Sequence, residues 1–107
     1  MITDDKVEKA LDFITGSAKK LAQAKANYDY LADYTKVLKA QIMKEHPKES
    51  AAGQEREAQN DPRYNEHLKV VKDAQAEYLH LQYLIDAAKV TLDIWRTQSS
   101  NERAARI

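Results

Sequence analysis

The chain contains no cysteine, and it has only two glycines and two prolines among its 107 residues. The lack of cysteine excludes disulfide bonds, thiolate metal sites and cysteine nucleophiles. The two glycines are isolated, so there is no glycine-rich phosphate loop. No window shows the alternating, β-branched pattern of a strand. These absences favour an all-α protein built from long helices.

The chain also lacks an excess of either charge and any long apolar run. Seventeen basic residues balance seventeen acidic ones, so the formal net charge is +0. That balance disfavours a dedicated nucleic-acid-binding protein, which usually carries a basic excess. A membrane-spanning helix needs about 20 mostly apolar residues, and the first residues do not resemble a signal peptide. We therefore expect no membrane attachment and a cytoplasmic location.

What the chain does have is an apolar pattern with helical spacing. The first set is Val7, Leu11, Ile14, Ala18, Leu21, Ala24, Tyr28, Leu31, Thr35, Leu38 and Ile42. The second set is Tyr64, Leu68, Val71, Ala74, Tyr78, Leu81, Ile85, Ala88, Leu92 and Trp95. A repeat near 3.5 residues is typical of left-handed helix pairs. The pattern predicts an antiparallel hairpin of two long helices, similar to a coiled coil.

Local signals set the boundaries of these helices. Thr3 is a good N-cap, and His46-Pro47 ends the first helix because proline lacks the amide hydrogen. Gly16 either ends a short first helix or lies within one continuous helix, which we favour because the apolar pattern keeps its phase. Ser50 is placed to cap a short helix in the connector. The predicted parts of this single domain, residues 1–107, are helix 1 at about 3–45, a connector at 46–61, helix 2 at about 62–98 and a tail at 99–107.

Helix 2 carries a second apolar stripe, which lies well over 100° away from the first on a helical wheel. Its members are Ala76, Leu79, Tyr83, Ala87, Val90 and Ile94. A hairpin covers only one side of helix 2, and a continuous exposed apolar patch usually marks an interface. We expect Leu79, Tyr83, Val90 and Ile94 to form a homodimer interface that gives a four-helix arrangement, or to bind a stable partner protein. The alternative is a short third helix from the connector or the N-terminal segment that folds over the stripe.

Motifs that carry chemistry are weak in this chain. Glu77 and His80 match the Glu-x-x-His spacing of di-iron helical bundles, but that site needs a second such motif and further glutamates. Nothing resembles a nucleophile elbow or a catalytic triad. The sequence therefore predicts a non-enzyme with no catalytic residues, metal, cofactor or small-molecule substrate.

Basic and aromatic residues suggest two further hypotheses about binding. Trp95, Arg96 and Arg103 lie near the C-terminal end, and tryptophan and arginine dominate interface hot spots. They predict a partner-docking end, unless Trp95 simply packs on the first turns of helix 1. Tyr30 and Tyr34 are candidates for stacking on nucleic-acid bases.

The part from residue 24 to 106 resembles a group of known proteins. The elements that carry the resemblance are Ser50, Glu55, Glu57 and Ala58, then Tyr64, and finally Trp95, Arg96, Ser99 and Arg103. The group consists of small proteins of tailed bacteriophages and prophages, encoded near early, recombination or replication genes. The resemblance implies a phage protein that works in the bacterial cytoplasm through protein contacts. It does not imply a particular activity.

Together these features favour a helical accessory or inhibitor protein that binds a protein of phage or host DNA metabolism. Two alternatives remain open. One is an accessory factor that binds single-stranded nucleic acid, and the other is a structural component of a particle.

Overall fold

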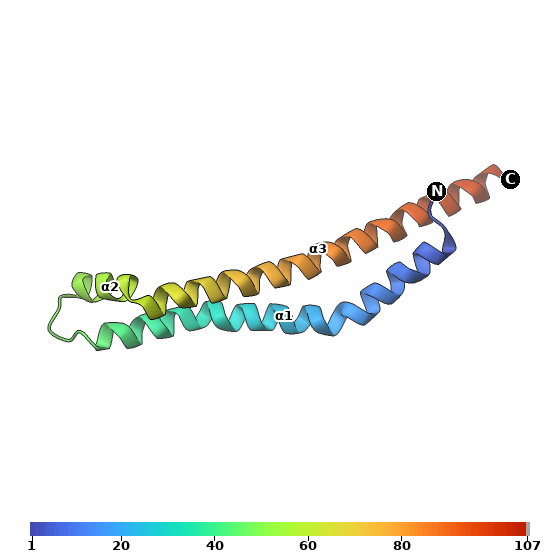
Figure 1. The fold of residues 1–107 in the computed structure, drawn as a ribbon. Helices are drawn as coiled ribbons and strands as arrows, with labels where there is room; N and C mark the ends of the chain where they lie inside the picture. The colour runs from blue at the N-terminus through green and yellow to red at the C-terminus, as the bar shows by residue number, and fades with distance from the viewer. Residues whose placement is uncertain (107) are drawn as a thin grey trace. The chain divides into compact units, whose positions relative to one another are not determined.

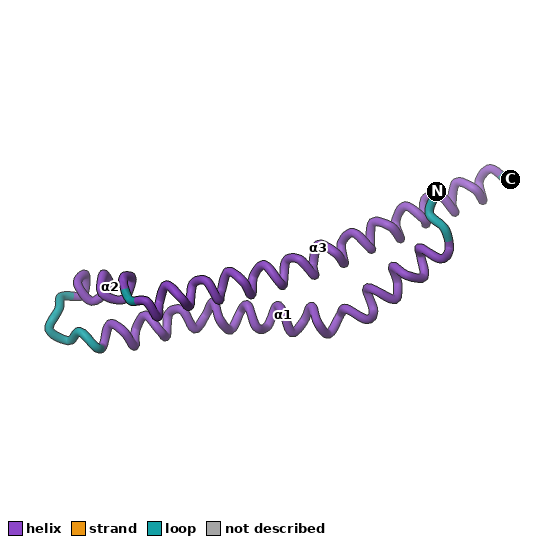
Figure 2. Tube along the Cα trace, viewed as in Figure 1, coloured by secondary structure: helices purple, strands orange, loops and turns teal. Residues whose placement is uncertain are grey.

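A computed structural model describes residues 1–106 of the chain. It contains three helices in that range: α1 spans Asp4–Lys44, α2 spans Ala51–Asn60 and α3 spans Pro62–Ala105 (Figures 1 and 2). No strand occurs among the described residues. The predicted all-α class is therefore confirmed.

The helix ends follow from local chemistry. The Thr3 hydroxyl accepts a hydrogen bond from the backbone N–H of Lys6 at 3.3 Å, which satisfies one free donor at the start of α1. Gly16 lies inside α1 without a positive φ, so the helix is not interrupted there. At the other end of the chain α3 continues to Ala105, through most of the segment expected to be a tail. Position 107, the last residue of that tail, lies outside the described residues.

The contacts within the chain fall into two compact units, each formed by part of α1 and part of α3. The first unit joins residues 1–22 to α3 from Leu79 onward, and the second consists of Gln23–Tyr78. In the second unit, Tyr28 stacks on Tyr78 with 6.1 Å between ring centroids, whereas Thr35 further along α1 meets His67 earlier in α3. The two helical segments of this unit therefore run in opposite directions, as Figure 1 also shows.

Most of the buried and half-buried positions of α1 and α3 follow alternating steps of three and four, and they correct the sequence prediction at three places. In α1 they include Ala10 and Ser17 instead of the predicted Leu11 and Ala18. In α3, His67 replaces Leu68, which is exposed. The reason is geometric: the 3.5-residue repeat fixes which positions face the partner helix, and at these three places that position holds the smaller or more polar of two neighbours. Small residues at Ala10 and Ser17 also reduce the distance that side chains impose between helices.

The connector forms a third packing element in the second unit. The Ser50 hydroxyl accepts a hydrogen bond from the Gly53 N–H at 3.1 Å and so caps α2. Ala58 on α2 and Ile42 near the end of α1 are both 0% exposed. A 2.6 Å ion pair between Lys39 and Glu55 links α2 to α1. It raises the pKa of the lysine and lowers the pKa of the carboxyl group.

Arg63 links the end of α1 to the start of α3. Its guanidinium donates to both Glu45 oxygens, at 3.0 and 2.9 Å, and to both oxygens of Asp61, at 3.1 and 2.9 Å. Asp61 also accepts from the Arg63 backbone N–H at 2.8 Å, at the first turn of α3. These bonds lower the pKa of Asp61 and raise the pKa of Arg63. All of these groups are near the surface, so their main effect is to fix geometry rather than to add much stability.

The exposed glycine in α1 leads to a stability prediction. An added Cβ at Gly16 would meet no atom within 4 Å. Alanine loses less backbone entropy than glycine on entering a helix, so Gly16→Ala is expected to raise the free energy of unfolding by about 0.5–1 kcal/mol. Urea unfolding followed by far-UV circular dichroism measures this change.

Gly53→Ala is the matched control for this prediction. There the added Cβ would lie 3.3 Å from the capping oxygen of Ser50 and 2.7 Å from a Glu49 carboxylate oxygen. The neighbours have to move, so the stabilisation is expected to be smaller than at Gly16. An equal increase in the free energy of unfolding for both substitutions would show that packing around the added Cβ does not influence stability.

Candidate functional site

The strongest candidate for a functional surface is an exposed apolar face of α3 in the first unit. Tyr83 is 65% exposed, Val90 is 54% exposed and Ile94 is 44% exposed, while Leu79 at the edge of the face is half-buried. We call these four residues the α3 stripe. They recur at steps of four, seven and four, so they share one side of the helix. The structure thus places all four predicted interface residues together on the surface of one unit.

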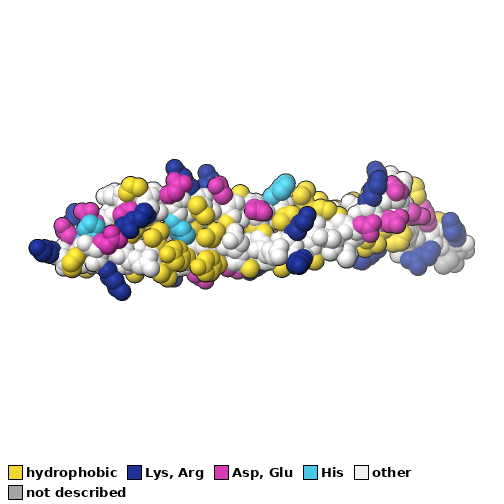
Figure 3. Space-filling view, turned by 60° about the horizontal axis from the view of Figure 1, so that its bottom comes forward, with side chains coloured by type: hydrophobic (Ala, Val, Ile, Leu, Met, Phe, Trp, Pro, Cys, Tyr) yellow, Lys and Arg dark blue, Asp and Glu magenta, His cyan; other side chains and the backbone are white. Residues whose placement is uncertain are grey.

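No segment of the described chain covers this stripe. The short connector helix α2, which could have done so, belongs to the second unit, where Gly53 and Ala58 are its buried residues. The N-terminal residues lie near the end of α3, where the Ile2 N–H donates to the Gln98 side chain at 3.1 Å. The alternative of an internal third helix over the stripe is therefore wrong for the described residues. On the face seen in Figure 3, hydrophobic side chains remain exposed between charged ones.

A shallow groove lies beside the stripe, between α1 and α3 of the first unit. Its volume is about 430 Å³, and it is lined by Ile2, Lys6, Lys9, Ala10, Phe13, Ala87, Ala88 and Thr91. We call it the α1–α3 groove. The sequence prediction missed this groove because Phe13 is next to the half-buried Ile14, which belongs to the main apolar pattern. The signal that could have identified it is the pair Lys6 and Phe13, seven residues apart and therefore on the same side of α1.

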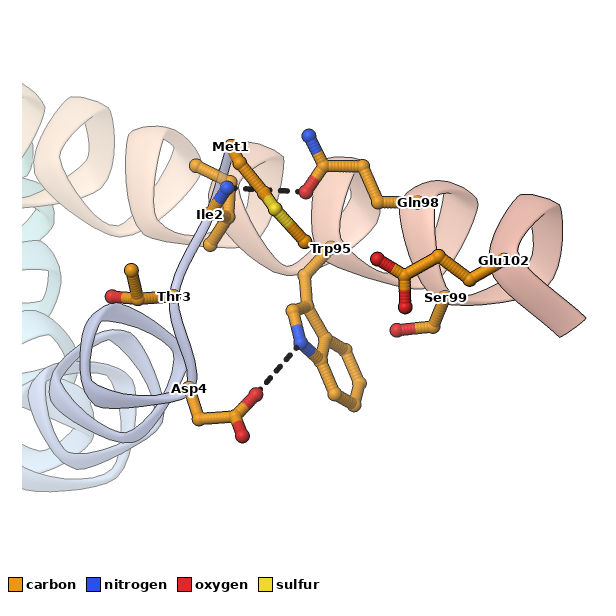
Figure 4. Close-up of a pocket in the computed structure, with 8 residues that line it drawn as sticks. All are labelled: Met1, Ile2, Thr3, Asp4, Trp95, Gln98, Ser99 and Glu102. Atoms are coloured by element: carbon orange, nitrogen blue, oxygen red, sulfur yellow. Dashed lines mark hydrogen bonds between the residues drawn. The ribbon is translucent and has the colours of Figure 1, made fainter.

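Trp95 faces the beginning of α1. Its indole Nε1–H donates a hydrogen bond to the Asp4 carboxylate at 3.3 Å, and its side chain is half-buried (Figure 4). A recess of about 310 Å³ beside the ring is also lined by Glu102, Ser99 and Met1. Trp95 is thus in contact with the first turn of α1. This agrees with the alternative in which Trp95 packs on the start of the first helix instead of docking a partner.

The two arginines of the predicted docking end do not join Trp95 in this recess. Arg96 is exposed and pairs with Asp93 at 3.5 Å, one helical turn away. Arg103 is exposed in the last turn of α3. Neither arginine lines the recess, whose charged residues are the acids Asp4 and Glu102. The geometry therefore gives no common surface to the tryptophan and the two arginines at this recess.

The tyrosines considered for base stacking lie in the second unit. Tyr30 stacks on Tyr34 at 6.2 Å, and Tyr34 contacts the His67 ring edge-on at 5.6 Å. His67 Nε2 lies 2.9 Å from the Leu31 carbonyl oxygen. Since a carbonyl oxygen can only accept, this nitrogen carries the hydrogen in that contact. Tyr34 therefore belongs to the packing around His67, and only Tyr30 offers an open ring face.

Residues 1–106 show little that would hold a metal or span a membrane. No group of three or more histidine, aspartate or glutamate side chains in this range could hold a metal ion. None of the helices described combines the length and the apolar character that crossing a membrane needs. Glu77 and His80 are both exposed.

Comparisons with known proteins give no indication of function for this chain. No protein-family model, curated protein or solved structure matches this chain. The α3 stripe, the α1–α3 groove and the recess beside Trp95 are consequently the features on which a functional interpretation rests.

Proposed function

We propose that this chain is a non-enzymatic helical interaction protein that forms a homodimer through the α3 stripe. In this proposal α1 and α3 form one antiparallel, coiled-coil-like hairpin, and two hairpins associate into four helices. The observation that carries the proposal is the exposure of Tyr83, Val90 and Ile94 on one side of α3. Isolated exposed apolar residues are common, but a contiguous set usually marks an interface.

The energetics support burial of this stripe in an assembly. A large apolar side chain gains about 1.5–3 kcal/mol on going from fully exposed to fully buried, and the stripe residues, which are already partly buried, gain part of that range. The stripe lies on the side of α3 away from the buried Ile85 and the half-buried Leu92, which are already packed within the unit. A second copy can therefore cover the stripe without disturbing the packing between α1 and α3.

The biological role that we propose is that of an accessory or inhibitor. The resemblance to small phage-encoded proteins supports a protein partner in phage or host DNA metabolism and work in the bacterial cytoplasm. Binding of single-stranded nucleic acid is less well supported, because Tyr30 is the only one of the two tyrosines considered for base stacking that keeps an open ring face. A structural role in a particle would use the same stripe but a larger assembly.

The absence of cysteine permits a direct test of whether the stripe becomes covered. A single thiol introduced by Val90→Cys should react more slowly with a thiol reagent as the protein concentration rises, because association buries it. The expected slowing is at least about tenfold between the monomeric and the associated state, because the reagent then reaches the thiol only in the minor open population. The rate of thiol modification, followed by mass spectrometry, gives the measurement.

The matched control is Val37→Cys, an exposed valine of the second unit. Its reaction rate should not depend on protein concentration. If the thiol at position 90 also reacts at a concentration-independent rate, the stripe is not a self-association surface.

A further inference from the structure

We infer that the recess beside Trp95 binds a guanidinium group, namely an arginine side chain of a protein partner. The recess lies between the first residues of the chain and the last turns of α3, within one unit. Trp95 follows Ile94 of the α3 stripe by one residue, so it points about 100° away from it around the helix. The inference therefore rests on the proposed role in binding a protein, but not on the proposed dimer.

The size and the openness of the recess indicate what can occupy it. Its volume of about 310 Å³ lies at the lower end of the range for small-molecule sites, about 300–1,000 Å³. A recess of this size suits one long side chain rather than a large cofactor. Asp4 and Glu102 on its border are both exposed, so a side chain from a second protein can reach it from solvent.

The charged side chains that line the recess are both acidic. Asp4 belongs to the first turn of α1, and Glu102 lies near the end of α3. Within residues 1–106, neither carboxylate forms an ion pair with a lysine, an arginine or the α-amino group of Met1. Figure 4 shows the two carboxylate groups on either side of the Trp95 indole. A cation that enters the recess is therefore attracted by two acids that no other group of the described chain neutralises.

The indole ring of Trp95 is oriented to add a further contact with a cation. Its Nε1–H donates to one oxygen of Asp4 at 3.3 Å, which fixes the orientation of the ring. A carboxylate has two oxygens, so the second one can accept from a ligand. Contact with Asp4 uses one edge of the half-buried ring, and Trp95 also lines the recess. Cations bind over the faces of aromatic rings, and tryptophan binds them best.

This combination of an indole and two carboxylates favours guanidinium over ammonium. Guanidinium is planar, stacks on aromatic faces and donates several N–H groups to carboxylates at once. It is also less strongly hydrated than ammonium, so it leaves water more easily. Each contact is weak because both acids are exposed, and together they give one arginine side chain a dissociation constant on the order of 10 mM. A protein partner adds contacts outside the recess.

Titration with an arginine analogue tests this site. Trp95 is the only tryptophan of the chain, so its indole N–H gives one resonance in a proton–nitrogen correlation spectrum. N-acetylarginine amide, added at constant ionic strength, should shift this resonance to saturation with a dissociation constant on the order of 10 mM. N-acetylcitrulline amide has nearly the same shape without the charge and should bind at least about fivefold more weakly. N-acetyllysine amide should bind at least about twofold more weakly, because an ammonium group does not stack.

A double variant tests whether the two acids hold the ligand. Asp4→Asn with Glu102→Gln keeps an oxygen that accepts from the indole, so the packing of Trp95 is retained. The dissociation constant for N-acetylarginine amide should rise at least about fivefold, because both ion pairs are lost. The matched control is Glu8→Gln with Asp12→Asn, two exposed acids of the same unit that do not line the recess. It removes the same charge and should change the dissociation constant less than about twofold.

Three results would overturn the inference. They are an indole resonance that does not shift with N-acetylarginine amide, equal binding of either analogue, and unchanged binding by the double variant when far-UV circular dichroism shows it to be helical. None of these results would contradict association through the α3 stripe, because that association is measured on Val90→Cys. A protein that binds the arginine analogue but leaves the thiol of Val90→Cys equally reactive at all concentrations would contradict the dimer alone.

Discussion

Replacing Ile42 with alanine is expected to lower the free energy of unfolding by about 2–5 kcal/mol, the range for deleting a large buried aliphatic side chain. Ile42 is the one large side chain among the described residues that is fully buried. It lies in the last turns of α1, in the unit that also contains α2 and its buried Ala58. Truncation removes apolar contacts and leaves a cavity that a packed helix end can only partly close. Guanidinium unfolding followed by circular dichroism measures the loss.

Two variants bracket this prediction. Ile42→Val keeps most of the volume and should cost only about 0.5–1.5 kcal/mol. Val37→Ala, five residues earlier on the exposed side of α1, should change stability by no more than about 0.5 kcal/mol. Equal effects at positions 37 and 42 would mean that α1 does not pack at its C-terminal end as described.

The double change Leu79→Asp with Ile94→Asp is expected to abolish dimerisation while leaving the helices intact. Each copy would bring two carboxylates into the apolar interface, and a charge buried without a partner costs several kcal/mol. The dissociation constant should rise at least about a thousandfold, since each 1.4 kcal/mol corresponds to a factor of ten. Sedimentation velocity on the helical variant tests this result.

Val37→Asp with Val70→Asp is the matched control for that variant. Both valines are exposed and belong to the second unit, so the net charge changes equally while the α3 stripe is untouched. This control should keep the wild-type association state. If it dissociates as completely as the stripe variant, general charge repulsion rather than loss of the stripe explains the effect.

The sequence predicts the helices well because their signals are local. Thr3 and Ser50 cap helices through hydrogen bonds to backbone groups three residues ahead, at 3.3 and 3.1 Å. Pro47 follows α1 closely, as expected for a residue that cannot continue a helix. None of these features depends on how distant parts of the chain meet.

The exact buried positions are harder to predict because adjacent residues on a helix compete for them. Hydrophobicity alone favours Leu11 over Ala10 and Leu68 over His67. The partner helix instead selects the smaller residue in the first case. In the second it selects a residue whose ring nitrogen reaches the Leu31 carbonyl oxygen, 36 positions away in the sequence. Such a pairing is visible only once the register between two helices is known.

The candidate surface also has one part that local sequence predicts and one part that depends on packing between helices. The α3 stripe follows from periodicity within one helix, so the sequence alone identifies it. The α1–α3 groove combines Phe13 with Ala87, which are brought together by packing between α1 and α3.

Sedimentation equilibrium of the unmodified chain tests most directly whether two copies associate. With a chain mass of 12.2 kDa, we expect a species of twice that mass at micromolar concentration, dissociating on dilution. A mass that stays at the single-chain value up to the highest concentration would contradict self-association through α3.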